Sequence, residues 1–476
     1  MNYYAKDCEL VLALVCPVGV NLEDVRSRLE HIFRQFRYVV NFVHLSQLVE
    51  AVADKSHLNE TDRLDTAMER GNALRRQYDR GDFMALLAVQ AINKRRNYNR
   101  DTPEPQTRTV HVIRSLKHAD EVETLRQTYG AGFFLLGVSA SLDSRRHHLR
   151  QVMGVPDEQI DRLVQRDDKE MSPFGQQTRN VFELADAYIT TDDTSRLSDQ
   201  LTRIIDILFS KPVASPTAEE YAMFMAYAAS LRSADLSRQV GAVVVNQQGD
   251  IVSTGANDVP KQGGGLYWPG EGDQRDHVRG FDYNERHKKE IAKEVVERLL
   301  GPDLAKDALN DALGKLKGSR LMAITEYGRA VHAEMETLLQ AARKGLSVCD
   351  GVLYATTYPC HNCAKHIVAA GIKEVVYIEP YPKSYATTLH KDAISDDGAH
   401  DDGKVRFRQF VGIGPRRFID LFSMRLSSGR NLIRKVDGKL AEWSRENAEL
   451  RVPMGPLSYL DSEVSLVKEL NMMMDG

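Results

Sequence analysis

The hydrophobic pattern of the N-terminal third alternates between strand-like and helix-like segments. The continuous apolar run 9–15 (ELVLALV) is typical of a buried strand, and in 22–36 the apolar residues recur at helical spacing. Further strand patterns lie at 38–43, 109–113 and 132–138, and further helix patterns at 83–94 and 122–128. This alternation predicts a mostly parallel sheet covered by helices.

A second alternating pattern begins after the Pro/Ser-rich stretch 210–216 (SKPVASP), which is the strongest candidate for a domain boundary. Thr217 and Glu220 have the spacing of a capping box and start a helix. Strand, strand, helix, strand, helix and strand patterns follow in that order, at 240–246, 251–255, 332–344, 351–357, 360–370 and 374–379. The pattern therefore predicts a second α/β domain.

The long segment 259–330 interrupts this second pattern. It contains three consecutive glycines and Trp268, and two helix-like stretches at 284–300 and 303–316. A mobile flap over a ligand and a plain surface loop both fit the glycine-rich part. Leucines at helical spacing after residue 422 indicate a tail that packs on a neighbour. We therefore predict domains at 1–211 and at 216–422, with the insertion 259–330, and a helical tail at 423–476.

Composition and charge narrow the class of protein. At 476 residues the chain is too long for one average domain, and a net charge of −4 gives no overall basic field for nucleic acid. Five cysteines are few and odd in number, which favours a reducing compartment over a disulfide framework. The N-terminal residues lack a secretory apolar region, and the apolar run near them is too short to span a bilayer. We therefore expect a soluble cytoplasmic protein with no membrane partner.

Three metal-ligating side chains stand out in the second domain. Glu334 follows His332 at a spacing of two, and Cys360 and Cys363 belong to the motif Pro-Cys-His-Asn-Cys. One imidazole and two thiolates leave a zinc position open for water, whereas a structural zinc is closed by a fourth protein ligand, so the set indicates catalysis. A redox pair, half of a zinc ribbon and unconnected residues are the alternatives. The upstream His-x-Glu, and the helix-like segment that each motif opens, weigh against all three.

His-x-Glu followed by Pro-Cys-x-x-Cys resembles the signature of the zinc-dependent nucleobase deaminases. Zinc lowers the pKa of bound water from 15.7 to about 7, so hydroxide is present at neutral pH. Glu334 is then expected to take a proton from this water and to pass protons to the ring nitrogen and to the departing ammonia. His361 and His366 lie beside the cysteines in sequence but are expected to have no catalytic role.

The segments around these motifs resemble the deoxycytidylate deaminases, which have the cytidine deaminase fold. The resemblance rests on the two motifs and on 233–242 (SADLSRQVGA), 255–258 (GAND) and 370–377 (AGIKEVVY). It implies that His332, Cys360 and Cys363 bind Zn²⁺ and that Glu334 is the proton shuttle. Some relatives hold a second, structural zinc on cysteines in the insertion, and since 259–330 contains no cysteine we expect none here.

The same resemblance suggests residues that bind the substrate. Asn257 would hydrogen-bond the sugar, although an asparagine that caps a turn is the alternative. Lys383, Ser384 and Tyr385 lie just after a predicted strand, where family members reach the substrate phosphate. For Lys383, a solvated surface charge is the alternative.

The N-terminal pattern places a turn, 17–22 (PVGVNL), where a phosphate-binding loop belongs, between a strand and a helix. The turn lacks the lysine and the hydroxyl that such a loop needs for phosphate and magnesium. The region resembles P-loop nucleoside and nucleotide kinases, including Gly175-Gln-Gln-Thr, a late strand at 185–189 and basic residues at 145–150. We interpret it as a degenerate kinase-like domain without kinase activity, while a purely structural scaffold remains the alternative.

The joined arrangement resembles the bacterial anti-phage dCTP/dCMP deaminases, which deplete deoxycytidine nucleotides. We therefore expect zinc-dependent hydrolysis of dCTP and/or dCMP to deoxyuridine nucleotides as antiviral defence. A polynucleotide cytosine or adenosine deaminase is one alternative, but the sequence shows no obvious basic groove with aromatic stacking residues. A nucleotide- or RNA-sensing switch with deamination as its output is another. The expected partners are free deoxycytidine nucleotides, further copies of the chain and an inhibitory RNA or nucleotide.

Overall fold

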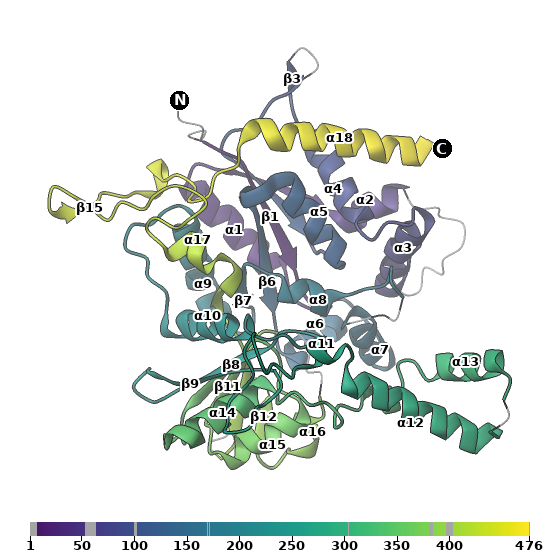
Figure 1. Cartoon of the computed structure of the whole chain (residues 1–476). Coiled ribbons are helices and arrows are strands. Elements are labelled where there is room, and N and C mark those ends of the chain that lie inside the picture. The colour runs from purple at the N-terminus through teal and green to yellow at the C-terminus, as the bar shows by residue number, and fades with distance from the viewer. Residues whose placement is uncertain are drawn as a thin grey trace. The chain divides into compact units, whose positions relative to one another are not determined.

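The computed structural model describes residues 7–52, 63–99, 102–168, 170, 172–302, 304–379, 384–396 and 403–475. The chain divides into two compact units, and each contains a six-stranded sheet (Figure 1). Unit 1 comprises residues 1–221, 378–382 and 409–476, and unit 2 comprises residues 222–377 and 383–408. The predicted α/β class is confirmed.

The sheet of unit 1 has the strand order β14-β7-β6-β1-β5-β2. Strands β7, β6, β1, β5 and β2 run parallel to their neighbours, whereas β14 is antiparallel to β7. Every residue of β1 is buried, as the continuous apolar run predicts for a central parallel strand. The strands are β1 (Leu10–Val15), β2 (Val39–His44), β5 (Thr109–Arg114), β6 (Phe133–Ser139), β7 (Ala187–Thr190) and β14 (Gly412–Ile413).

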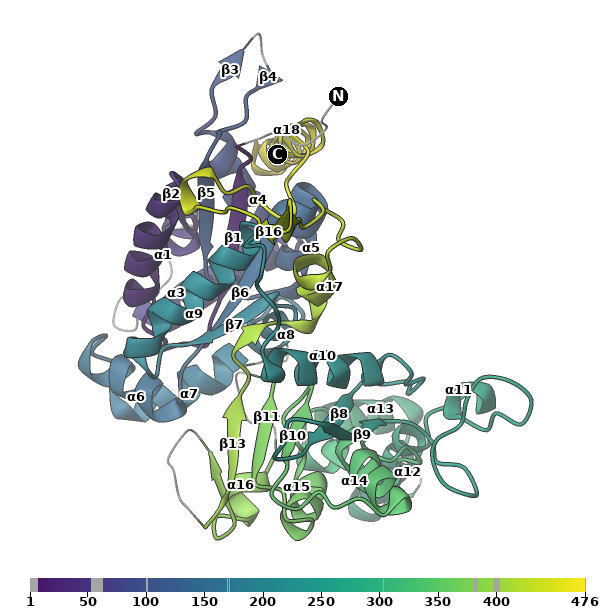
Figure 2. The same ribbon diagram turned by 90° about the vertical axis from the view of Figure 1, so that its left-hand side faces the viewer.

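Helices cover both faces of this sheet, as Figure 2 shows for α1 and α9 on one face and α4 and α5 on the other. The helices that follow the strands are α1 (Glu23–Gln35), α4 (Phe83–Asn93), α5 (Ala119–Tyr129), α6 (Leu142–Gln151) and α9 (Thr194–Leu208). Shorter or peripheral helices are α2 (Leu45–Val52), α3 (Arg63–Gln77), α7 (Asp157–Asp168), α8 (Thr178–Glu183), η1 (Gly130–Gly132), η3 (Pro415–Arg417), α17 (Phe418–Phe422) and η4 (Arg445–Asn447). Two-stranded ribbons are formed by β3 (Tyr98–Asn99) with β4 (Thr102–Pro103) and by β15 (Lys435–Val436) with β16 (Lys439–Leu440).

The C-terminal helix α18 (Pro456–Asp475) packs on α4 and α5. A buried ionic cluster anchors it, because the Arg96 guanidinium donates to the carboxylates of both Glu9 and Glu463, each at 2.6 Å. All three side chains are wholly buried. The last helix of the chain is therefore joined to the start of its first strand, and the tail does pack on a neighbour.

The sheet of unit 2 has the order β12-β13-β11-β10-β8-β9. Strand β10 pairs parallel with β11, while β8 is antiparallel to both β10 and β9. The strands are β8 (Gly241–Val245), β9 (Ile251–Ala256), β10 (Val352–Ala355), β11 (Glu374–Tyr377), β12 (Ile394–Asp396) and β13 (Val405–Gln409). Helix α10 (Ala218–Ser230) precedes β8 in the chain, and the short α16 (Ala386–Leu389) precedes β12.

Helix α14 (Ala333–Lys344) lies on β8 and β9 and also contacts α15 (His361–Ala369). The close approach of α14 to β9 requires Gly255, because a Cβ at that position would lie 2.2 Å from the carbonyl oxygen of Ala333. Both helices end at a glycine-containing turn, with Gly345 and Gly371 at positive φ, as the sequence indicates. The packing brings the first turns of the two motif helices together.

The insertion forms α11 (Asp276–Arg279), the long α12 (Tyr283–Leu300), α13 (Lys306–Lys315) and η2 (Arg320–Ala323). Figure 1 shows α12 and α13 side by side, away from the sheet of unit 2. Helix α12 buries only Ala292 and Val296, and ion pairs at i,i+4 spacing follow its exposed face. The predicted helical stretches are thus present, and they form a solvated arm.

One strand differs from the sequence expectation. Strand β14 pairs with β7, so Gly412 and Ile413 lie in the sheet of unit 1, although the sequence places them within the predicted domain 216–422. A two-residue strand such as Gly412–Ile413 has no alternation from which its partner could be predicted. Within the described residues, no helix has the length and apolar character needed to cross a membrane.

Candidate metal centre and active site

His332, Cys360 and Cys363 lie together where α14 and α15 begin. His332 is the residue that precedes α14, and Cys360 occupies the same position before α15. The Nδ1 atom of His332 lies 3.2 Å from Sγ of Cys360 and 3.3 Å from Sγ of Cys363. The ligand atoms of the three side chains all lie within 4.8 Å of one another. Residues far apart in the sequence thus form one compact donor set.

The geometry of this donor set fits a zinc ion. Tetrahedral zinc at ordinary Zn–N and Zn–S lengths separates a nitrogen from a sulfur by roughly 3.6 Å. The two N–S distances, 3.2 and 3.3 Å, are slightly shorter, as expected for groups in direct contact. Three donors of this kind leave the fourth tetrahedral position without a protein ligand.

Contacts within the donor set stabilise a thiolate at Cys360. A hydrogen bond from the Cys363 thiol, together with contacts to His332, lowers the pKa of Cys360 to about 4. The hydrogen bond with Cys360 raises the pKa of His332 to about 9. The backbone N–H of Cys363 also donates to Sγ of Cys360, at 3.4 Å, as the open start of a helix allows. Cys360 is therefore a stable thiolate at neutral pH.

Glu334 lies on the first turn of α14, two residues after His332, and only 4% of its surface is exposed. Burial raises the pKa of its carboxyl, and the neighbouring Cys360 raises it further. The carboxyl also interacts with the thiol of Cys363. A carboxyl with a raised pKa, next to the donor set, holds a proton more readily than an exposed glutamate does, as a group that accepts and passes on protons requires.

Asn257 follows β9 and has its side-chain amide turned to the backbone of the 238–240 segment. The amide Oδ1 accepts from the N–H of Val240 at 2.6 Å, and Nδ2 donates to the carbonyl of Arg238 at 2.8 Å. The backbone carbonyl of Asn257 accepts from the hydroxyl of Ser233. The structure therefore shows the contacts of an asparagine that caps a turn, which is the alternative to a role in substrate binding. One of the two protons on Nδ2 takes no part in these contacts.

The two remaining substrate-binding predictions lie after β11. Lys383 falls outside the described residues. Tyr385 immediately precedes α16, is 46% exposed, and has the guanidinium of Arg320 at 5.4 Å from its ring centroid. The hydroxyl of Ser384 donates to the carbonyl of Pro359 at 2.9 Å. This contact brings the segment next to the residue before Cys360.

The two other histidines near the cysteines lie outside the metal cluster among the described residues. The Nδ1 atom of His366 contacts the carbonyl of Asn362 at 2.6 Å, within the same helix. His361 interacts electrostatically with Glu326, a residue of the insertion. The partners of both histidines, Asn362 and Glu326, are thus residues other than the zinc ligands.

Sequence reasoning missed a buried ion pair beside the site. The Nη1 atom of Arg275, in the insertion, lies 3.3 Å from Oδ2 of Asp258, and the side chains are 4% and 1% exposed. Asp258 accepts from the N–H of Ala234 and pairs through its backbone with Val331, the residue before His332. Asp258 adjoins Asn257 in the quoted motif, so proximity in sequence was a usable signal. No feature of the sequence indicated that Arg275 would pair with Asp258.

Comparison with known proteins agrees with this geometry. Residues 216–379 match the family described as the cytidine and deoxycytidylate deaminase zinc-binding region. The deoxycytidylate deaminase of Enterobacteria phage T2 is 32% identical over 162 residues, which cover 34% of this chain and 79% of the phage protein. This chain belongs to the deoxycytidylate deaminase family.

Two further relatives have lower sequence identity to this chain. The human deoxycytidylate deaminase is 24% identical over 206 residues, which cover 43% of this chain and 86% of the human protein. A solved structure of the dCMP deaminase from cyanophage S-TIM5, in complex with dCMP and dUMP, covers 41% of this chain with 19% identity and a TM-score of 0.25.

The zinc-binding region and the His332, Cys360 and Cys363 cluster identify this family member as a zinc-dependent deaminase, a hydrolase. The match to the family begins at residue 216, so most of unit 1 lies outside it.

Proposed function

We propose that this deaminase hydrolyses free deoxycytidine nucleotides, dCTP and/or dCMP, to deoxyuridine nucleotides and ammonia. The observation that carries the proposal is the buried Glu334 beside the His332, Cys360 and Cys363 donor set, in a region 32% identical to a phage deoxycytidylate deaminase. The donor set supplies the metal position, and the carboxyl supplies the proton transfers that hydrolysis of an amine requires.

In this proposal His332, Cys360 and Cys363 hold the zinc ion. Zinc, when bound, supplies a nucleophile at neutral pH by lowering the pKa of water. Glu334 takes the proton released as the oxygen adds to C4 of cytosine and delivers it to the ring nitrogen N3. It then takes the remaining proton of the added hydroxyl and passes it to the exocyclic amine, so that the C4 carbonyl forms, the C4–N bond breaks and the amine leaves as neutral ammonia. The raised pKa of Glu334 suits both the uptake and the return of the proton.

The substrate would lie between the end of β9 and the segment before α16. We assign the free Nδ2 proton of Asn257 to a hydroxyl of the sugar, since the other contacts of its amide hold that nitrogen in place. Tyr385 and Lys383 are assigned to the phosphate side of the nucleotide. The contact between Ser384 and Pro359 supports this placement because it fixes the segment next to the cysteine motif.

We further propose that the enzyme depletes dCTP as a defence against phage. A degenerate kinase-like domain at 1–211, a deaminase domain at 216–422 with its insertion 259–330, and a helical tail at 423–476 make up the proposed architecture. The parallel sheet of unit 1, with a loop after β1 that lacks the phosphate-binding lysine, supports this reading. An enzyme that drains dCTP requires restraint, and an inhibitory RNA or a nucleotide is proposed for that role, with assembly into a homo-oligomer.

The test of substrate class uses the purified full chain with zinc. It is incubated separately with dCMP, dCTP, cytidine, single-stranded DNA and RNA, and ammonia and uracil products are measured. We expect turnover of the free deoxycytidine nucleotides. Turnover of oligonucleotides without turnover of dCMP or dCTP would replace the proposal with a polynucleotide deaminase.

The test of cellular role compares bacteria that express the chain with bacteria that express Glu334→Ala. We expect the active chain to lower the dCTP pool during phage infection and to reduce plaque numbers. Equal plaque numbers for the two strains, despite a lowered dCTP pool, would separate the chemistry from the defence role and overturn the latter.

A further inference from the structure

Unit 1 contains a cavity of about 290 Å³ at the carboxyl ends of β1, β5 and β2. The loop after β1, the segment after β5 and helices α2 and α3 provide its walls. In this sheet the chain leaves β1 toward β2 and leaves β5 toward β6, on the other side of β1. Adjacent strands whose connections diverge leave a crevice, and open α/β sheets bind their ligands there.

Two backbone N–H groups of the loop after β1, those of Val18 and Val20, already have partners within the protein. The N–H of Val18 donates to Oδ2 of Asp167 at 2.8 Å, and Lys117 donates to Oδ1 of the same carboxylate at 2.6 Å. Lys117 comes from the segment after β5 and also donates to the carbonyl of Cys16. The side chain of Asp167 is wholly buried, so a carboxylate of the protein occupies the position of an anion on this loop.

The loop is closed on its other side by α6. Gly19 has a φ of +89°, and a Cβ there would lie 2.8 Å from the carbonyl oxygen of Arg145 and 2.9 Å from Cγ of Leu149. Val18 and Leu149 belong to an apolar cluster with residues of α3 and α7. A phosphate at this loop would therefore have to compete with Asp167 for the N–H of Val18, and α6 packs closely against Gly19.

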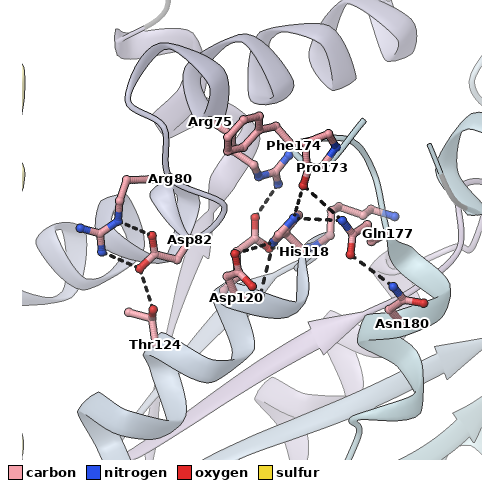
Figure 3. Close-up of polar contacts among 12 residues, drawn as sticks. Arg75, Arg80, Asp82, His118, Asp120, Thr124, Pro173, Phe174, Gln177 and Asn180 are labelled. Atoms are coloured by element: carbon pink, nitrogen blue, oxygen red, sulfur yellow. Dashed lines mark hydrogen bonds and ion pairs between the residues drawn. The ribbon is translucent and has the colours of Figure 1, made fainter. Parts of the chain in front are cut away.

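The lining charges are mostly neutralised within the protein. Arg75 pairs with Glu121, Arg114 with Glu23 and Lys117 with Asp167. Figure 3 shows Arg75 beside the start of α5, where His118 is held by the Pro173 carbonyl and by Gln177. This wall of the cavity is thus built from groups that already have partners.

Two lining charges differ from the others. Among the described residues, the Nε atoms of both Arg70 and Arg75 are buried without a hydrogen-bond partner, but Arg75 is paired with Glu121, whereas neither Arg70 nor Glu50 forms an ion pair. Arg70 is a hydrogen-bond donor with a positive charge, and Glu50 is an acceptor with a negative charge. The two charges cancel. The apolar part of the lining includes Met68 and Met84, whose flexible thioethers adapt to flat rings.

We infer that this cavity binds an uncharged nucleoside or a similar heterocycle that carries both a carbonyl acceptor and an N–H donor. Its volume of about 290 Å³ lies just below the usual range for ligand pockets, about 300–1,000 Å³, which favours a nucleoside over a ligand with a phosphate tail. Arg70 donates to the acceptor of the ring, and the methionines contact its faces. This site is separate from the deaminase site in unit 2, and the inference does not rest on the proposed substrate.

The inference is tested by calorimetry on the full-length zinc-loaded chain with the four deoxynucleosides, thymidine among them, and with dTTP. Thymidine has no exocyclic amine, so turnover does not complicate its titration. We expect at least one nucleoside to bind and dTTP to bind no more tightly than thymidine. Arg70→Ala and Met68→Trp, which remove the donor and fill the cavity, should each weaken nucleoside binding at least tenfold.

Arg76→Ala on the same helix is the matched control and should bind as the unchanged chain does. The deamination rate of each variant shows that unit 2 is intact, and the melting temperature shows whether unit 1 folds. If Met68→Trp fails to fold, Arg70→Ala decides the result. Absence of binding by all four nucleosides, equal binding by folded Arg70→Ala, or tighter binding of dTTP than of thymidine would overturn the inference.

Discussion

The fold buries the carboxyl of Glu334, and burial raises the free energy that its ionisation requires. It is almost fully buried on the first turn of α14, close to a thiolate that disfavours a second negative charge. Its position follows from the sequence alone, because His-x-Glu at the start of a helix puts both side chains on the first turn. The raised pKa does not follow, since it depends on groups brought by α15.

The first prediction concerns this carboxyl. Glu334→Gln should lower kcat by at least about a hundredfold, because the amide cannot relay a proton, while zinc content stays unchanged. Turnover and the zinc-to-protein ratio are measured on the same sample. Glu294→Gln, on the solvated face of α12, is the control and should retain full activity. A Glu334→Gln enzyme with wild-type kcat would refute the proton-transfer role.

The second prediction concerns the metal ligands. A chelator should abolish deamination, and addition of Zn²⁺ but not of Mg²⁺ should restore it, since imidazole and thiolate donors favour zinc over hard cations. Cys363→Ser should lower the zinc-to-protein ratio measured after dialysis. Restoration by magnesium, or full zinc retention by Cys363→Ser, would contradict the assignment of the donor set.

The elements of both sheets could largely be predicted from hydrophobic periodicity. The runs that became β1, β6 and β8 are apolar over most of their length, and each motif helix ends at a turn that contains glycine. Strand β14 and the contacts of the insertion could not be predicted, because a two-residue strand and a single long-range arginine leave no periodic signal. The amide of Asn257 illustrates the same limit, since its partners lie in a loop rather than in an element.

The third prediction concerns the insertion, in which Arg275 pairs with Asp258, the residue after Asn257. Arg275→Gln would leave Asp258 buried with less compensation and loosen the segment that holds Asn257. We expect a loss of stability of about 3 kcal/mol and a higher KM, with zinc content retained. Urea unfolding and steady-state kinetics measure the two effects.

A matched change supports that interpretation. Arg279→Gln removes a nearby arginine on α11 that makes exposed contacts with Tyr283 and Gln274. It should leave both KM and stability close to those of the unchanged chain. If Arg275→Gln lowered kcat with KM unchanged, the effect would lie at the reacting atoms rather than in substrate positioning.

Across the whole molecule, the buried cluster of Glu9, Arg96 and Glu463 makes the stability of unit 1 depend on pH. Burial acts to raise the pKa of Glu9, but hydrogen bonds from His111 and Arg96 outweigh it and hold the pKa below its ordinary value of 4.5. The stabilisation is therefore present above about pH 4.5 and is lost as the pH falls through the lower, folded-state pKa.

The fourth prediction follows from the lowered pKa of Glu9. In a Trp268→Phe background, the fluorescence of Trp443 reports on unit 1, where its indole N–H donates to the carbonyl of Phe209. The urea midpoint should fall between pH 7 and acidic pH, and Glu9→Gln should show a lower midpoint at pH 7 with a smaller further fall. If the urea midpoint fell equally in both proteins, a group other than Glu9 would be responsible for the loss of stability at acidic pH.

The pairing of β14 with β7, and of Glu463 with Arg96, sets an order of events during synthesis. Most of unit 2 is contiguous in the chain and is translated before residue 409, whereas unit 1 needs segments from both sides of it. At ordinary translation speeds of about 5–20 residues per second, the start of the chain waits several seconds more for its final strand and helix. The half that holds the zinc motif therefore becomes complete on the ribosome first, although it is encoded second.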